Sequence, residues 1–303
     1  MLIFIIALLV LVLVIYLIGN YFYTHSIQKE SIMKKRNDPE IDAGEEEYLE
    51  WFKQNTSCLT MYSEDAEHLK LNAYTKLCSG SKKWAVILHG YAGNAKRMSM
   101  YAKKFFDQGY NILLPDLRGH GLSEGSYIGM GIRDSKDIID WCNLLNKNHA
   151  DARIVLVGIS MGAATVMSAS GRENLPKNVK AIIEDCGYTS TYDQFAYQLK
   201  RDYNLPPFPV MQIANLYVKI KHGFSYKDYA PIDMLAKSNL PIFLIHGDAD
   251  RYVPFEMLDE LSKVVNAEKK VIAVHDAKHT EARKILGEKY FEEVFNFLSK
   301  FMY

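Results

Sequence analysis

The sequence G-I-S-M-G at residues 158–162 is the feature with the clearest chemical meaning. An apolar run at 154–157 precedes it, and a stretch of small residues at 163–169 follows it. Two glycines around a serine permit the sharp strand-to-helix turn that exposes a serine hydroxyl at a helix N-terminus. An ordinary turn is the competing interpretation, but the strand before and the helix after favour a reactive group. The pattern therefore predicts that Ser160 is a nucleophile.

A serine nucleophile needs an acid that orients its base, and the sequence offers three carboxylates for this role. A serine hydroxyl is weakly nucleophilic at neutral pH, so a histidine must take its proton and a carboxylate must hold the histidine. In hydrolases with this turn, the acid and then the histidine follow the serine along the chain. Asp250, in the loop after the predicted strand 242–245, is the predicted acid. Asp248 in the same loop is the alternative, and Asp185 is a weaker candidate.

The base must come from one of the two histidines that follow Asp250. His275 ends the predicted strand 271–274, where a packing role is the simpler interpretation. His279 lies four residues further on, in the loop, where its ring could reach Ser160. The sequence therefore predicts His279 as the base.

Acyl transfer also needs hydrogen-bond donors for the oxyanion that develops during the reaction. The backbone N–H of Met161, directly after the nucleophile, is one expected donor. The backbone N–H of Tyr91 is the other, because Tyr91 lies in the loop after the buried strand predicted at 84–88. Gly90 and Gly93 permit the tight course that this loop requires.

Apolar runs alternate with stretches of helical spacing from residue 59 onward. Strands are predicted at 69–74, 84–88, 112–114, 154–157, 179–183, 242–245 and 271–274. Helices are predicted at 95–107, 132–147, 163–169, 254–265 and 288–301. This alternation predicts an α/β fold with a mostly parallel central sheet flanked by helices. Ligands of such sheets bind beyond the carboxyl ends of the strands, where the predicted site residues lie.

Several of these stretches together resemble the α/β-hydrolase superfamily. They are V-I-L-H-G-Y-A-G-N (86–94), D-L-R-G-H-G-L-S (116–123), G-I-S-M-G-A (158–163), H-G-D-A-D-R-Y-V-P (246–254) and A-K-H (277–279). Within the superfamily they are most similar to serine aminopeptidase-like and esterase-like bacterial hydrolases, over residues 59–303. The resemblance implies a Ser160–Asp250–His279 triad and an oxyanion hole formed by Tyr91 and Met161.

The resemblance also has one departure and one structural motif. Lys278 stands where the family often has glycine before its histidine. Arg118 and His120 match a family loop that is usually structural, and no catalytic role is expected for them.

The N-terminus is predicted to be a transmembrane anchor, residues 1–23. Residues 2–18 carry no charge, and at 1.5 Å per residue the segment to residue 23 spans about 33 Å, against a hydrocarbon core of about 30 Å. A cleaved signal peptide is the alternative, but it would need a basic start, and residues 1–25 contain no lysine or arginine. The basic residues that follow the helix are Lys29, Lys34, Lys35 and Arg36. By the positive-inside rule they predict a single-pass protein with a cytoplasmic catalytic domain.

The rest of the chain is predicted to form a linker and one large domain. Residues 24–56 are acid-rich and are expected to be a solvated juxtamembrane linker with one short amphipathic helix near 48–52. Residues 57–303 form the predicted hydrolase domain, with a helical cap insert at about 187–238. Because the apolar run ends before any motif begins, removal of residues 1–25 is expected to leave a soluble, active enzyme.

Composition and the cap set the expected substrate class. Lys plus Arg (36) equals Asp plus Glu (36), and no nucleic-acid partner is expected from a chain without a basic excess. No Cys/His spacing suggests zinc, so no metal or organic cofactor is expected. The aromatic-rich cap favours a small-molecule or lipid-like ester, hence a carboxylesterase or lipase-like enzyme. A serine peptidase (aminopeptidase-like), an acyltransferase and a non-enzymatic scaffold are the alternatives.

Overall fold

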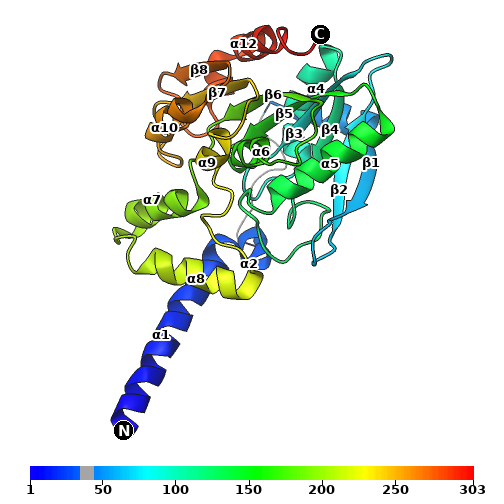
Figure 1. The fold of residues 1–303 in the computed structure, drawn as a ribbon. Coiled ribbons are helices and arrows are strands. Elements are labelled where there is room, and N and C mark those ends of the chain that lie inside the picture. Colours follow the sequence, from blue (N-terminus) through cyan, green and yellow to red (C-terminus); the bar gives the residue numbers. More distant parts are fainter. Residues whose placement is uncertain (35–43) are drawn as a thin grey trace.

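An eight-stranded sheet forms the centre of the computed structural model, which describes residues 1–34 and 44–303 (Figure 1). The strands are β1 (Ser57–Tyr62), β2 (Lys70–Lys76), β3 (Lys83–Leu88), β4 (Asn111–Pro115), β5 (Arg153–Ile159), β6 (Val179–Asp185), β7 (Ile242–Gly247) and β8 (Lys269–Val274). Their order is β1-β2-β4-β3-β5-β6-β7-β8. Only the pairs β1–β2 and β2–β4 are antiparallel. The predicted mostly parallel sheet is confirmed, and β1 is a strand that the sequence pattern did not predict.

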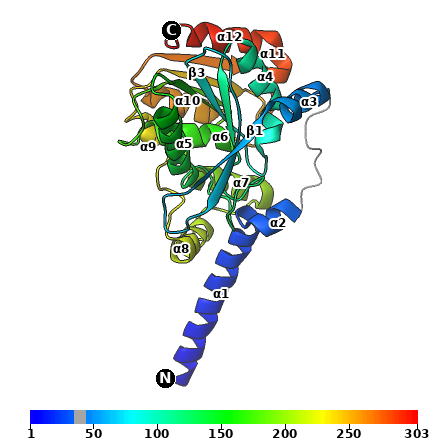
Figure 2. The ribbon, with the colours of Figure 1, turned by 90° about the vertical axis from the view of Figure 1, so that its right-hand side faces the viewer.

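Helices cover both faces of this sheet (Figures 1 and 2). The chain enters through α1 (Leu2–Ser26), α2 (Lys29–Lys34) and α3 (Glu46–Asn55). The helices between strands are η1 (Ala95–Met98), α4 (Ser99–Asp107), α5 (Asp134–Asn148), α6 (Met161–Ser170), α7 (Thr191–Tyr203), α8 (Val210–His222), α9 (Pro231–Leu235) and α10 (Glu256–Val264). The chain closes with α11 (Ala282–Leu286) and α12 (Glu288–Leu298). All five predicted helices are present, with α9 and α11 as additional short turns of helix.

Strand β3 shows why the central strands are apolar without alternation. Trp84, Val86 and Leu88 pack into one core cluster with α5, α6 and the cap. Ala85 and Ile87 pack into the other, with α3, α4 and α12. Successive side chains of a strand point to opposite faces, so a strand covered on both sides must be apolar throughout.

The insert between β6 and β7 forms the helical cap. Helices α7 and α8 are separated at residues 204–209, where the sequence L-P-P-F-P lies. Asn204 ends α7 in the left-handed conformation, with φ at 53°. The insert therefore contains two main helices, and α8 lies across the base of α1 (Figure 1).

Helix α1 has two halves with different surroundings. Residues 2–14 are exposed and project away from the domain, whereas Gly19 and Tyr23 are buried (Figure 2). A Cβ on Gly19 would lie 2.7 Å from the Cβ of Tyr217 on α8, and the Tyr217 hydroxyl donates to Asn20 Oδ1 at 2.9 Å. The predicted boundary after residue 23 is thus revised, because the second half of α1 is part of the folded domain.

The predicted linker is also largely packed. Ile27 and Ile32 are buried in the core, and Gln28 forms a β-bridge with Tyr127. The expectation of a solvated tether is therefore wrong for residues 27–34. The short amphipathic helix is confirmed as α3, which buries Leu49 and Phe52. Lys35, Arg36 and the acidic residues of 38–42 lie outside the described residues.

The packing of α1 leads to a prediction about stability. Removing residues 1–14 should change the melting temperature of the detergent-solubilised protein by no more than ~2 °C, because these side chains touch little else. Removing residues 1–26 should lower it by roughly 5–10 °C, since loss of the buried Tyr23 costs about 2–4 kcal/mol. Calorimetry of the two truncated proteins measures this, and equal melting temperatures would contradict the packing described.

Candidate active site

Ser160 lies on a strained turn between β5 and α6. Its backbone has φ 55° and ψ −116°, a conformation that residues with a Cβ rarely adopt. A Cβ on Gly158 would lie 2.2 Å from the Gly162 carbonyl oxygen, and one on Gly162 would lie 2.4 Å from the Leu88 carbonyl oxygen. Both glycines are therefore required by close backbone approach, and the turn holds the serine at the carboxyl end of the sheet.

His279 lies between Ser160 and Asp250. Its Nε2 is 2.8 Å from Ser160 Oγ, and its Nδ1 is 2.6 Å from Asp250 Oδ2. Because the carboxylate only accepts, Nδ1 carries the proton and leaves Nε2 able to accept one from the serine hydroxyl. The structure thus brings together three side chains that lie up to 119 positions apart in the chain. This geometry suits proton transfer from serine to histidine.

The alternative acid and base lie elsewhere. Asp248 and His275 form their own exposed pair, with Oδ2 and Nδ1 2.9 Å apart. Asp185 is buried at the end of β6, where the Tyr290 hydroxyl donates to it at 2.9 Å. None of these three side chains has a hydrogen bond with the Ser160 hydroxyl among the described contacts, and Asp185 meets Ser160 only through the backbone, where its carbonyl accepts from the Ser160 N–H at 2.8 Å.

Asp250 has a second histidine partner that the sequence interpretation missed. His246 Nε2 is 3.2 Å from both Asp250 Oδ2 and the Val253 carbonyl oxygen, so Nε2 carries the proton. Burial by itself raises the pKa of Asp250, but the hydrogen bonds from His246 and His279 and from backbone N–H groups hold it well below its usual range. The carboxylate that orients His279 therefore stays ionised. The sequence does contain a signal for this contact, because His246 directly follows the predicted strand 242–245 and Asp250 lies four residues further on.

This electrostatic setting predicts a pH dependence of stability. A lowered folded pKa means that ionised Asp250 stabilises the protein above the unfolded pKa of about 4, and that this contribution is lost as the pH falls through the folded value. Asp250→Asn should lower the free energy of unfolding by roughly 1–3 kcal/mol at pH 6. Urea unfolding of both proteins should show this difference shrinking below about pH 4. A difference that grows with acidity would contradict the assignment.

Tyr91, the second predicted oxyanion donor, lies in the loop after β3. Tyr91 and Met161 both line the cavity beside Ser160. The next residue, Ala92, donates its N–H to His120 Nε2 at 3.1 Å. Burial, and the nearby His89, lower the pKa of His120 well below its usual value, so the ring remains a neutral acceptor. His120 thus supports the loop, in agreement with the structural role expected for it.

Ser160 lies between two cavities. One of about 380 Å³ has Glu45, Arg97 and Arg283 in its lining, together with apolar and aromatic side chains such as Met98 and Tyr101. The other, of about 220 Å³, lies toward the cap and α1. Ser160, Tyr91 and Tyr252 line both. A substrate bound at Ser160 therefore meets a polar chamber on one side and the cap on the other.

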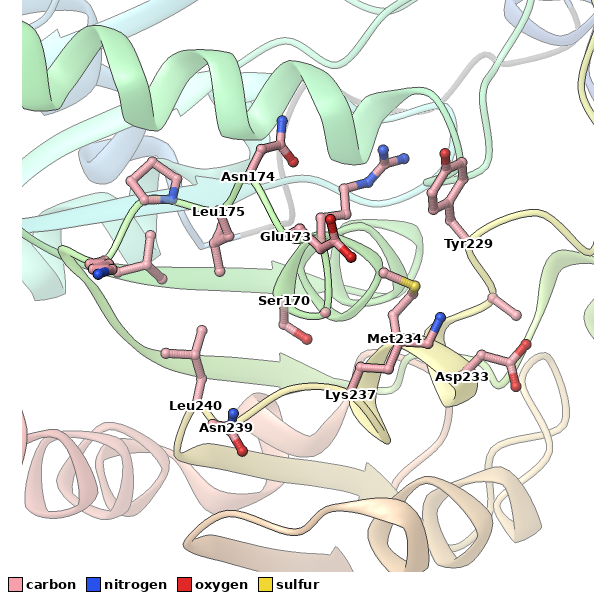
Figure 3. A pocket seen from close by; sticks show the side chains of 16 residues that line it. Ser170, Glu173, Asn174, Leu175, Tyr229, Asp233, Met234, Lys237, Asn239 and Leu240 are labelled. Atoms are coloured by element: carbon pink, nitrogen blue, oxygen red, sulfur yellow. The ribbon is translucent and has the colours of Figure 1, made fainter.

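A larger cavity of about 1000 Å³ lies at the opposite end of α6 (Figure 3). Its walls come from Ser170, at the end of that helix, and from the segment around Tyr229 to Leu240. Arg172 on this wall stacks on the Tyr229 ring at 3.6 Å. No predicted site residue lines it, so its volume alone gives no reason to place the chemistry there.

Two clusters have donor atoms close enough to hold a metal ion within the described part of the chain. Cys186, Asp250 and His279 form one, but the last two already bond to each other, and burial raises the pKa of the Cys186 thiol well above its usual value. Metal binding requires the thiolate, which is thus disfavoured. Asp248, His275 and Asp276 form the other, which is fully exposed. Neither cluster is assigned a metal.

Comparison with known proteins gives matches to hydrolases. The family described as "Serine aminopeptidase, S33" matches residues 79–200. The uncharacterized protein YqkD of Bacillus subtilis is 29% identical over 195 residues, which are 64% of this chain and 64% of YqkD. The Pyrococcus furiosus esterase Pf2001 superposes with a TM-score of 0.66 at 23% identity, covering 86% of this chain and 97% of the esterase.

A peptidase has the same fold. The acylaminoacyl peptidase of Pyrococcus horikoshii gives a TM-score of 0.61 at 17% identity, covering 82% of this chain and 42% of the peptidase. With the sheet order and the turn at Ser160, these matches show that the chain has the α/β-hydrolase fold. Residues 79–200 are the part of the chain that is similar to the S33 family.

Proposed function

We propose that the chain is a membrane-anchored serine hydrolase that cleaves apolar acyl esters, as a carboxylesterase or lipase-like enzyme. The contact of His279 with both Ser160 Oγ and Asp250 carries this proposal. In it, Ser160 is the nucleophile, His279 the base, Asp250 the orienting acid, and the Tyr91 and Met161 N–H groups the oxyanion donors.

The reaction has two halves. Ser160 Oγ bonds to the ester carbonyl carbon while its proton passes to His279 Nε2, and the leaving alcohol takes that proton as the C–O bond breaks. Water then attacks the acyl-enzyme, giving one proton to His279, which returns it to Ser160 Oγ as the carboxylic acid leaves. Ionised Asp250 stabilises the imidazolium in both halves.

Ion pairing at the two cavities favours esters over peptides with a free amino terminus. An aminopeptidase needs a carboxylate for the substrate's ammonium group. Glu45 and Asp202 are the acids that line these cavities, and each is paired with an arginine: Arg283 at 2.5 Å and Arg201 at 2.6 Å. A serine peptidase remains the second candidate because of the S33 match and the peptidase of the same fold.

Helix α1 supports the anchor. It is 25 residues long, and the described part of the chain contains one helix apolar enough to cross a membrane. A cleaved leader would have no reason to pack, yet Tyr217 and Tyr91 hydrogen-bond to Asn20 and to the Ser26 carbonyl. Lys29 and Lys34 follow the helix and favour the cytoplasmic side for the catalytic domain.

A probe and a substrate panel test the proposal. The full-length protein in detergent should react with a fluorophosphonate and hydrolyse p-nitrophenyl esters faster than aminoacyl p-nitroanilides. Heat-denatured protein is the control for nonspecific labelling. Faster cleavage of the anilides would favour the peptidase. The absence of both labelling and turnover would refute the proposal.

A further inference from the structure

The end of the apolar helix α1 forms part of the wall beside Ser160. His25 and Ser26 line the 220 Å³ cavity together with Phe195 and Gln198 of the cap helix α7. The Tyr91 hydroxyl donates to the Ser26 carbonyl oxygen at 2.8 Å, which ties α1 to the loop that carries the predicted oxyanion donor. The anchor is therefore also a component of the active site.

The hollow continues away from Ser160 along α1. A cavity of about 130 Å³ is also lined by His25, Ser26, Phe195, Gln198 and Asp202, and it extends to Tyr21 and Phe22 of α1. Because the two cavities share these walls, they form one groove between α1 and α7. The end of the groove far from Ser160 is lined by the aromatic residues Tyr21 and Phe22. Aromatic residues of this kind favour the interface of a bilayer.

Exposed apolar side chains lie on the cap helices beside α1. The exposed ones on the cap are Tyr203, Leu205, Phe208, Leu216 and Ile220, with Phe208 71% and Ile220 78% exposed. They come from the end of α7, the α7–α8 connection and α8, which lies across the base of α1 (Figure 1). Lys219 and Lys221 lie among them on α8, as in helices that rest on a lipid surface. A bilayer spanned by α1 would meet this face.

We propose that the substrate is an acyl ester resident in the bilayer, and that its acyl chain reaches Ser160 through the groove between α1 and α7. This inference rests on the proposed ester hydrolysis at Ser160. The polar part of the ester then occupies the 380 Å³ chamber with Glu45, Arg97 and Arg283, on the other side of the serine. In the groove the acyl chain contacts Phe22 and Phe195 and passes the partly exposed Arg201–Asp202 ion pair, and the membrane supplies the substrate directly.

Blocking the groove tests the route. Gln198→Trp fills it from α7, and His25→Trp, at an exposed position on α1, fills it from the other wall. Lys200→Trp is the matched control, since Lys200 is exposed on α7 and lines neither cavity. Each full-length protein is reconstituted into vesicles of ether-linked phosphatidylcholine, which has no ester bond. The vesicles contain 1-oleoylglycerol or dioleoylphosphatidylglycerol, and p-nitrophenyl acetate is the soluble reference.

The readout is kcat/KM for the bilayer ester divided by kcat/KM for p-nitrophenyl acetate. Both groove variants should lower this ratio at least ~10-fold, and Lys200→Trp should keep it within ~2-fold of wild type. An unchanged ratio in both groove variants, or hydrolysis of the acetate but of neither bilayer ester by wild type, would overturn the inference and leave the proposed function standing. Absence of acetate hydrolysis and of fluorophosphonate labelling would instead refute the proposed function.

Discussion

Replacing Ser160 with alanine should lower kcat for p-nitrophenyl butyrate by at least ~10³-fold and abolish labelling by a fluorophosphonate. The loss corresponds to about 4 kcal/mol of transition-state stabilisation, because Ser160 Oγ is the hydroxyl that lies 2.8 Å from His279 Nε2. Alanine retains a Cβ and so bears the same backbone strain at φ 55° as serine. The turn, and with it the fold, should therefore persist.

Ser170→Ala is the control for this substitution. Ser170 is also buried on α6, donates to the Met167 carbonyl at 2.8 Å, and lines the large cavity of Figure 3. Its loss should leave labelling and turnover within ~2-fold of wild type. Normal labelling of the Ser160 variant, or loss of turnover in the Ser170 variant alone, would contradict the assignment of Ser160. The active site would then have to lie at the other end of α6.

Alanine variants of His279 and His275 should differ in kcat by about as much as the Ser160 variant differs from wild type. His279→Ala should lose at least ~10³-fold in kcat, because the base contacts both Ser160 Oγ and Asp250. His275→Ala should retain activity within ~3-fold, since its exposed ring pairs only with Asp248 and Asp276 among the described contacts. Steady-state kinetics on both variants, each checked by circular dichroism, measures the difference.

A double variant sharpens this result. Members of one triad act as a unit, so Ser160→Ala combined with His279→Ala should be no slower than either alone. If the folded His279 variant kept most of its activity while the His275 variant lost it, the base would be His275. The loop after β8 would then adopt another course in solution.

The sheet was predictable because burial on both faces leaves a direct mark on composition. The runs at 84–88, 154–157 and 242–245 are apolar throughout, and each became a central strand. β1 was missed because it lies at the edge of the sheet, where Cys58 and Thr60 are exposed and polar and apolar residues are mixed. The other edge strand, β8, was predicted because it contains the apolar run 271–274, which has no equivalent in β1.

The geometry around Ser160 was predictable for a related reason. Parallel strands end at one edge of the sheet, so residues after β5, β7 and β8 must meet there. The packing of α1 against the cap was not predictable in this way. Gly19 meets Tyr217 and Ser26 meets Tyr91 across long chain separations, and no periodicity in either segment encodes these pairs.

The two halves of α1 should also differ in which substitutions homologous chains tolerate. Residues 2–14 need only be apolar, so leucine, isoleucine, valine and phenylalanine are interchangeable there. At Gly19 no side chain fits between the backbone and Tyr217, and Tyr23 fills a closed space. Among homologous chains the first half should therefore drift freely in sequence, while Gly19 and Tyr217 should change together.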